Sequence, residues 1–363
     1  MNQKVIISVS QLFVMLFISR VIVNLTYSIY VVDINNMWEH FSSSIIAFVL
    51  TIVMTLPVYF LYKTTNNSSV LDTSYNVFSK IGALIVIIYA IYFLWVLCYT
   101  ISLFDIFVTD LMNPNISSIS LSIAVVVASV YGAIKGIEAI GRTSTIIFFA
   151  ILIVFIFLAV ALFPQVNSNN LQPLFYGGAK TTLQGVVFML GRNSCIPVMA
   201  VLISMTKGEK KKIKRGIFFW SFSIYGFSTL FIYLTVGVLG KYYLSTQAFP
   251  IYTVASVAQV GIFQRLDAVF LGAWTAGIFI KTSLFIYLVS ICVKKIWGEK
   301  ASKISILIVG AIVLFCSYAV SLSTDAMSIL FNNNVLMILT FITALLIPVI
   351  LLIKINRKGV AKV

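Results

Sequence analysis

Two arginines, Arg20 and Arg192, stand out among the residues of this chain that could do chemistry. Each lies near the middle of an apolar run that is long enough to span a lipid bilayer. A guanidinium keeps its proton there, and placing it at the bilayer centre costs at least about 2.5–3.5 kcal/mol. The two runs take matching positions in the two halves of the chain. This arrangement predicts a polar cavity between helices that holds a negatively charged ligand.

A purely structural role for the two arginines is the alternative. It requires an acid at membrane depth, and Asp105 is the only such acid in the predicted spans. One carboxylate cannot neutralise two guanidinium groups, although backbone carbonyls at helix breaks or snorkelling of the side chains could satisfy the remainder. The planar guanidinium suits carboxylate or phosphate because it binds two oxygens at once. We therefore expect at least one of the two arginines to bind a ligand.

The elements that must position these residues are transmembrane helices. The 363 residues are 61% hydrophobic and 10% charged, whereas soluble domains are about 45–50% apolar and about 25% charged. We expect an all-α polytopic membrane protein that forms a single integral domain over residues 1–363. The ten predicted spans are roughly 8–31, 43–62, 81–108, 116–134, 143–163, 184–205, 217–239, 267–290, 304–323 and 335–353.

The ten spans divide as five plus five, which predicts inverted repeats over about 1–163 and 184–363. Spans 1 and 6 each carry an arginine among polar or helix-weakening residues, at 19–26 and 191–197. Paired interrupted segments of this kind indicate a transporter-like site, because unwound helices present free backbone groups to a ligand. We expect helices 1 and 6 to be broken, although span 1 has neither the glycine nor the proline that span 6 has.

The predicted site draws on these two spans and on span 3, which is rich in aromatic residues. An aromatic stripe is more often packing than a ligand cage, but span 3 faces the site in such a fold. The expected ligand-binding residues are Arg20, Asn24, Tyr99, Asp105, Gly191, Arg192, Asn193 and Ser194.

Lys281 lies in the middle of span 8 and is followed by Thr282 and Ser283. These three residues form a predicted ion-site or proton-linked group, because an ammonium there can stand in for a bound cation. Three roles remain open for the lysine. It could tether span 8 to carbonyls of span 1, act as a proton-linked switch, or snorkel to the membrane surface.

Basic residues are unevenly distributed between the predicted loops. If both termini are cytoplasmic, 19 of the 25 Lys and Arg residues lie on the cytoplasmic side, including the run at 207–215. This bias predicts the orientation. It also accounts for the net charge of +15 without a nucleic acid, because the charge is spread over short loops. The loop at 241–264 is half apolar, and we expect a short helix there over the outer mouth.

Catalytic and metal-binding patterns are missing from the sequence. His40 is the only histidine, and the four cysteines fall within or at the edge of predicted spans, at spacings that suit neither a metal site nor a disulfide framework. The spans contain neither a Gly-x-Ser-x-Gly motif nor paired carboxylates. We therefore expect no enzyme activity, no metal and no cofactor.

Three stretches resemble one protein family. They are KVIISVSQLFVMLF at the N-terminus, KGIEAIGRTSTIIF at the start of span 5, and FQRLDAVFLGAWTAGIFIKTSLFIYL in span 8. The chain resembles the B subunit of endospore germinant receptors, the spore germination permeases. The sequence departs from many members at 21–24 and at 191–193, where glycines or a Gly–aromatic–Glu element would stand, and this makes the predicted site strongly basic.

The resemblance implies an amino acid–polyamine–organocation transporter fold, shortened to ten helices, in the inner membrane of a bacterial spore. It implies a small-molecule germinant, often an amino acid, bound between helices 1, 3, 6 and 8. It also implies two partners, an A-type membrane subunit and a C-type lipoprotein. A ligand sensor that signals to partner subunits is the favoured function. A proton-coupled permease for amino acids or organic anions remains the alternative.

Overall fold

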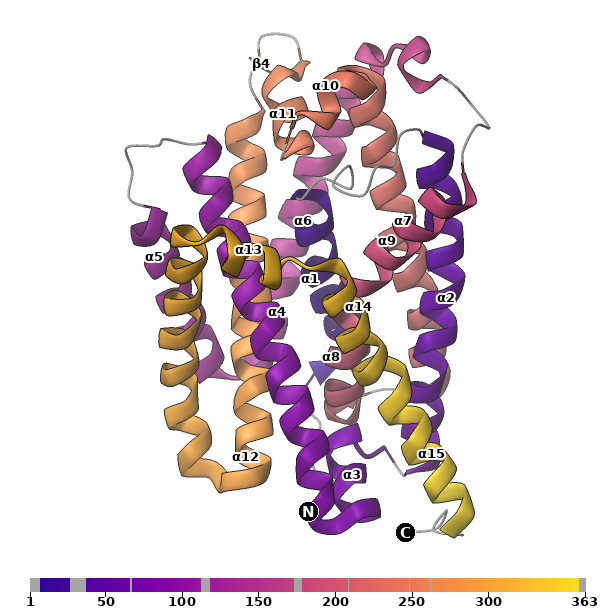
Figure 1. Ribbon diagram of the computed structural model, residues 1–363, viewed down its shortest axis with the longest axis vertical. Coiled ribbons are helices and arrows are strands. Elements are labelled where there is room, and N and C mark those ends of the chain that lie inside the picture. Colours follow the sequence, from indigo (N-terminus) through magenta and orange to yellow (C-terminus); the bar gives the residue numbers. More distant parts are fainter. Residues whose placement is uncertain are drawn as a thin grey trace.

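The computed structural model describes residues 7–26, 37–65, 67–111, 118–172, 178–207, 209–247, 249–260, 263–264 and 266–358, which form a bundle of long helices (Figure 1). The helices that build the bundle are α1 (Val9–Thr26), α2 (Met37–Thr64), α4 (Gly82–Leu111), α5 (Ser118–Lys135), α6 (Ile137–Leu162), α7 (Ala179–Gly191), α8 (Cys195–Leu202), α9 (Lys210–Leu239), α12 (Asp267–Leu322), α14 (Asn333–Phe341) and α15 (Ile347–Lys358). A π-helical segment, Ile342–Leu346, joins α14 to α15.

Short elements connect the long helices at the two ends of the bundle. The short helices are α3 (Val70–Phe78), α10 (Lys241–Ser245), α11 (Pro250–Val257) and α13 (Thr324–Leu330). Four two-residue strands form two pairs, β1 (Ile7–Ser8) with β2 (Thr206–Lys207) in parallel, and β3 (Gln259–Val260) with β4 (Phe263–Gln264) antiparallel. Helices α10 and α11 lie at the end opposite α3 (Figure 1), so the short helix predicted within 241–264 is present.

The described helices have the length and apolar character of a multi-pass membrane protein. Seven helical segments are long and apolar enough to cross a membrane, and two shorter apolar helices are Val9–Ile22 and Ile119–Lys135. Large apolar side chains remain exposed on the outside of the bundle, where lipid would cover them. The predicted count of ten spans and the inverted repeat remain predictions.

Helix α12 contains a sharp reversal at Gly298, where two predicted spans meet. Gly298 has φ 88° and ψ −175°, a conformation that glycine adopts without a steric penalty. Figure 1 shows the two limbs of α12 turning back on each other at the end of the bundle that also holds α3. The reversal brings both limbs against α4 and α5.

The structure confirms one predicted helix break and contradicts the other. Helix α7 ends at Gly191 and α8 begins at Cys195, so the chain leaves helical geometry within span 6. Pro197 lies in the first turn of α8, where its missing N–H leaves no helical hydrogen bond unmade. Helix α1, in contrast, is continuous from Val9 to Thr26, so the break predicted within residues 19–26 is wrong. The physical reason is that α1 contains neither glycine nor proline.

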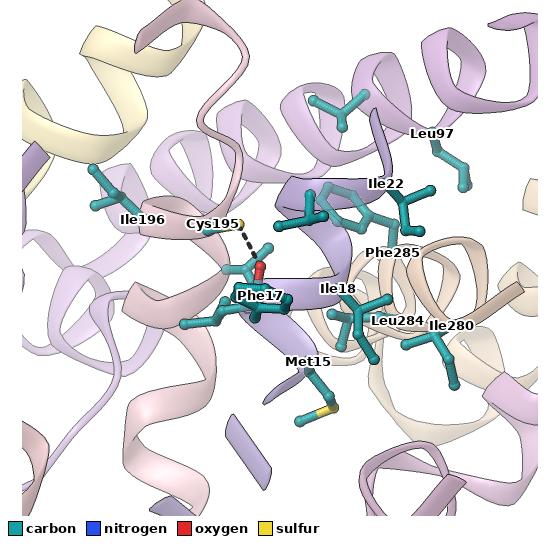
Figure 2. Packing of buried hydrophobic residues seen from close by; sticks show 14 of the residues in the cluster. Met15, Phe17, Ile18, Ile22, Leu97, Cys195, Ile196, Ile280, Leu284 and Phe285 are labelled. Carbon is teal, nitrogen blue, oxygen red and sulfur yellow. Dashed lines mark hydrogen bonds between the residues drawn. The ribbon is translucent and has the colours of Figure 1, made fainter. Parts of the chain in front are cut away.

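Helix α1 lies in the centre of the bundle and contacts α6, α8, α9 and α12. Figure 2 shows Ile18 and Ile22 of α1 beside Leu284 and Phe285 of α12, with Cys195 of α8 close by. The Cys195 thiol donates to the carbonyl of Leu16 at 3.1 Å. Both arginine-bearing segments are therefore held against each other by apolar packing and by hydrogen bonds.

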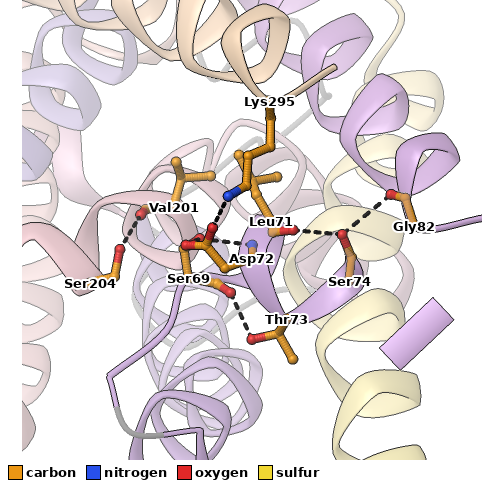
Figure 3. Close-up of polar contacts among 9 residues, drawn as sticks. All are labelled: Ser69, Leu71, Asp72, Thr73, Ser74, Gly82, Val201, Ser204 and Lys295. Carbon is orange, nitrogen blue, oxygen red and sulfur yellow. Dashed lines mark hydrogen bonds and ion pairs between the residues drawn. The ribbon is translucent and has the colours of Figure 1, made fainter. Parts of the chain in front are cut away.

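Helix α3 joins several helices at the end of the bundle that carries the Gly298 turn (Figure 3). Its Asp72 forms an ion pair with Lys295 of α12. The Ser74 hydroxyl donates to the carbonyls of Leu71 and Gly82, at 2.8 and 3.3 Å. Helix α3 also contacts α2, α8 and α15, so it connects both halves of the chain at this end.

The turn between α3 and α4 depends on the absence of a side chain at Gly82. A Cβ there would overlap the carbonyl group of Ser74 and lie 2.8 Å from the backbone nitrogen of Tyr75. We predict that Gly82→Ala lowers stability by about 1–3 kcal/mol, because backbone atoms cannot move aside as a side chain can. Thermal unfolding in detergent measures this.

The matched control is Gly226→Ala in α9, where nothing lies within 4 Å of the added Cβ. That change should be neutral or stabilise by about 0.5–1 kcal/mol, because alanine favours helix. Equal effects of the two substitutions would contradict the tight α3–α4 turn.

Candidate functional site

A cavity lies beside the break between α7 and α8. Its volume is about 10 Å³, which is room for roughly one water molecule, and it opens toward solvent. Four elements contribute to its wall, namely α4, the α7–α8 segment, α12 and α14. The lining residues are Val96, Tyr99, Gly191, Arg192, Ser194, Lys281 and Leu336. Among the described residues, the lining contains two basic side chains, Arg192 and Lys281, and no acidic one.

Arg192 follows the last residue of α7 directly, and its side chain is 6% exposed. Its Nε donates to the hydroxyl of Tyr99 on α4 at 3.0 Å, and its Nη1 donates to Oδ1 of Asn333 on α14. The guanidinium carbon lies 3.7 Å from the ring centroid of Phe188, within the range of a cation–π interaction. These three partners, a phenol, an amide and an aromatic ring, are neutral groups.

Arg20 lies in the middle of α1 and is 1% exposed. Its Nη2 donates to the carbonyl of Met189 in the last turns of α7, and the group also interacts with Tyr225 of α9. Its Nε and Nη1 are buried and have no hydrogen-bond acceptor among the described residues. Arg20 is not a lining residue of the cavity, so it lies behind the wall and binds the broken helix.

Lys281 of α12 lines the cavity and is 2% exposed. Its Nζ lies 5.6 Å from the ring centroid of Phe285, one turn further along the same helix. The predicted hydrogen bond from Lys281 to carbonyls of α1 is not found among the described residues. Lys281, Arg20 and Arg192 lie close enough to repel one another electrostatically. Three basic side chains therefore meet at the helix break, where the two guanidinium groups give a positive potential.

A close backbone contact fixes the end of α7. A Cβ on Gly191 would lie 3.0 Å from the backbone nitrogen of Met337 and 3.3 Å from the carbonyl oxygen of Asn333. The Gly191 carbonyl also accepts a hydrogen bond from the Thr340 hydroxyl at 2.8 Å. Helix α14 therefore packs directly on the broken segment, which places Arg192 next to Asn333.

The structure brings together five of the predicted site residues. The ones that line the cavity are Tyr99, Gly191, Arg192, Ser194 and Lys281. Arg20, Asn193, Thr282 and Ser283 do not line it. Asn24 belongs to α1, but its side chain lies outside the described residues.

Asp105 was predicted at this site, but it lies outside the lining of the cavity. Its carboxylate accepts hydrogen bonds from the hydroxyls of Ser122 on α5 and Ser317 on α12. The physical reason is its position along the helix. Asp105 is six residues beyond Tyr99 and nearer the end of α4, so it lies farther along α4 than the cavity does. The carboxylate is satisfied by hydroxyl groups of the neighbouring helices.

Residues Val96, Asn333 and Leu336 also belong to the site, although the sequence pattern did not predict them. Val96 lines the cavity from α4 and Leu336 lines it from α14, and Asn333 holds the guanidinium of Arg192. The three consecutive asparagines at 332–334, just before an apolar run, are the signal that could have indicated a polar contact there.

Comparison with known proteins agrees with this architecture. The profile described as "Spore germination protein" matches residues 6–324, which is most of the chain. The chain belongs to the spore germination protein family. It is 22% identical over 222 residues to spore germination protein YndE of Bacillus subtilis (strain 168), covering 61% of each chain. It is 22% identical over 279 residues to the putative spore germination protein YfkT of that organism, covering 77% of this chain and 76% of the relative.

A solved structure of a Na⁺-coupled sialic acid symporter, in a substrate-bound outward-open state, shares the fold. The TM-score is 0.67 at 11% sequence identity, and the alignment covers 94% of this chain and 80% of the symporter. The all-α transporter fold predicted from the sequence is therefore confirmed. Family and fold are those of transporters or receptors rather than of enzymes.

We predict that Tyr99→Phe lowers the stability of the ligand-free protein by about 1.5–3 kcal/mol. The phenol oxygen accepts from the charged Nε of Arg192, and its loss leaves a buried cationic donor without this acceptor. Thermal unfolding of the purified protein measures the effect. Tyr318→Phe, on the exposed side of α12, is the control that should change little. Equal midpoints for the two variants would contradict the assigned role of Tyr99.

Proposed function

We propose that this family member is the germinant-sensing subunit of a spore germination receptor. In this proposal it binds a small molecule with a carboxylate group, an amino acid or another carboxylate, in the cavity at the α7–α8 break. The observation that carries the proposal is the buried Arg192 guanidinium, held by the neutral partners Tyr99 and Asn333 in a cavity that also contains Lys281. A carboxylate is the group that this arrangement favours.

Ligand binding would change the contacts between the broken helix and α14. A carboxylate that pairs with Arg192 competes with the amide oxygen of Asn333, because both need the guanidinium N–H groups. A charge-assisted hydrogen bond is about twice as strong as a neutral one. Such competition can shift a two-state equilibrium by the difference in ligand affinity between the two states.

A route from the cavity to the predicted cytoplasmic side begins at α8. The strand β2 follows the end of α8 and pairs with β1, which precedes α1. The basic start of α9 comes next, with Lys210, Lys211 and Arg215 exposed. We propose that movement of α8 reaches partner subunits, an A-type membrane subunit and a C-type lipoprotein, through this surface. The proposed location is the spore inner membrane, with both termini cytoplasmic.

A proton-coupled permease for amino acids or organic anions is the second candidate function. The likeness of the fold to a Na⁺-coupled symporter favours it, because a fold of this kind can transport as well as sense. Sensor and permease use the same cavity, so transport itself distinguishes them.

Arg192→Gln should weaken binding of a carboxylate ligand at least about tenfold, because a charge-assisted hydrogen bond contributes about 1.5–3 kcal/mol. Binding is measured by isothermal titration with the purified protein in detergent. The matched control is Arg142→Gln on α6, which removes an exposed arginine paired with Glu138. The control should bind as the parent does. Unchanged ligand affinity in a folded Arg192→Gln variant would contradict the assignment of this site.

We also predict no net uptake of ligand by the protein alone in liposomes, because a sensor needs only to change conformation. Uptake of radiolabelled carboxylate is measured with and without a proton gradient across the membrane. Concentrative uptake that depends on the gradient and is lost in Arg192→Gln would show that the protein is a permease and would contradict the proposed sensor function.

A further inference from the structure

The small size of the cavity at the α7–α8 break means that one of its walls must move before a ligand can enter. The cavity has room for about one water molecule, and a carboxylate group alone is larger than that. We propose that α14 is the movable wall, and that it swings about the π-helical segment Ile342–Leu346. This inference rests on the proposed function, because it concerns how the same site opens.

Helix α14 is the least restrained of the elements around the cavity. Helices α4 and α12 pack extensively against each other, and the residues on both sides of the α7–α8 break are buried. Helix α14, in contrast, packs mainly on α7, and its buried residues are Leu336 and Thr340, one turn apart. Ile338 on another side of α14 is 58% exposed. Elements with few buried contacts open at the lowest free energy.

Thr340 makes the polar contact that holds this part of α14 on the break. Its hydroxyl donates to the Gly191 carbonyl at 2.8 Å. Because this donation uses the single hydroxyl proton, the Tyr92 hydroxyl of α4 is the donor in its 3.1 Å contact with Thr340 Oγ1. The chain of hydrogen bonds from α4 to α7 therefore passes through α14. Movement of α14 away from the break must disrupt it.

Pro348 gives α14 a point about which to move. In a regular α-helix its ring would clash with the carbonyl of Ala344, four residues earlier. The chain forms a π turn instead, in which the Ile347 N–H donates to the carbonyl of Ile342, five residues earlier. The same spacing pairs position 348 with Thr343, but a proline has no N–H to donate. Helices bend at prolines and at π turns, so this segment is suited to act as a hinge.

The Thr343 carbonyl obtains a donor from another helix. The hydroxyl of Tyr89 on α4 donates to it, and both residues are fully buried. Tyr89 and Tyr92 are three residues apart, so they lie on one face of α4. Helix α4 thus holds the hinge and the movable wall through two neighbouring phenols. Helix α15, beyond the hinge, is anchored by its packing on α2 and α3.

The test measures how readily a reagent in solution reaches the cavity. The reporter is Ser194→Cys, because Ser194 lines the cavity and is 2% exposed. The purified full-length protein is treated with 2-sulfonatoethyl methanethiosulfonate, and modification is followed by intact mass. The protein without the reporter is the blank. Because the reagent is too large for the closed cavity, its rate of reaction reports opening.

Thr340→Val should raise the modification rate about three- to tenfold, because α14 loses a hydrogen bond to the break. Thr340→Ser keeps the hydroxyl and should react at the rate of the parent. The matched control is Thr235→Val on α9, where the buried hydroxyl donates to the Phe231 carbonyl of its own helix. This control should also react at the rate of the parent.

Tyr89→Phe should raise the rate as well, because the Thr343 carbonyl loses this donor. Addition of Pro348→Ala should bring the rate back toward that of the parent, since alanine supplies an N–H at the hinge. An unchanged rate in Thr340→Val, or no reversal by Pro348→Ala, would overturn the proposal. The measurement uses no carboxylate, so a failure here is distinct from a failure of the proposed function, which appears as unchanged ligand affinity in Arg192→Gln.

Discussion

The need to hold two arginine side chains inside a membrane-spanning bundle constrains the rest of the structure. Arg192 uses a phenol, an amide and an aromatic face from α4, α14 and α7. Arg20 uses a carbonyl of the broken helix. Removing a charge from water costs several kcal/mol unless interactions with such partners offset that cost. The two arginines therefore tie α1, α4 and α14 to the α7–α8 segment, and these are the elements around the cavity.

The same arrangement links the fold to function. Neutral partners hold a guanidinium less strongly than a carboxylate does, so a carboxylate ligand can displace them. Gly191 allows α14 to pack directly on the break. The strand β2, which follows α8 in the chain, pairs with β1, which precedes α1. A change at Arg192 is thus connected through packed elements to one end of the bundle. A packed core of this kind changes between discrete arrangements rather than deforming gradually.

Much of this architecture could be predicted from residue patterns, and the failures have physical causes. Gly191 and Pro197 marked the break in span 6, and burial of Arg192 followed from its apolar surroundings. The matching break predicted in span 1 was wrong. It was expected from the symmetry of the two halves, but α1 contains no residue that weakens a helix strongly. Asn333 and Leu336 were missed because they are more than 140 positions away from Arg192 in sequence, and tertiary packing alone brings them to the cavity.

The most direct test of the account is a distance between a bound carboxylate and the Arg192 guanidinium. Solid-state NMR can measure the dipolar coupling between a bound ligand with a ¹³C-labelled carboxyl group and ¹⁵N-arginine-labelled protein in lipid bilayers. The account predicts a strong coupling, at a carbon–nitrogen distance of about 4 Å typical of a bidentate pair, that disappears in Arg192→Gln while Arg20 remains labelled. A coupling that persists in Arg192→Gln, or a bound carboxylate with no coupling to any arginine, would contradict it.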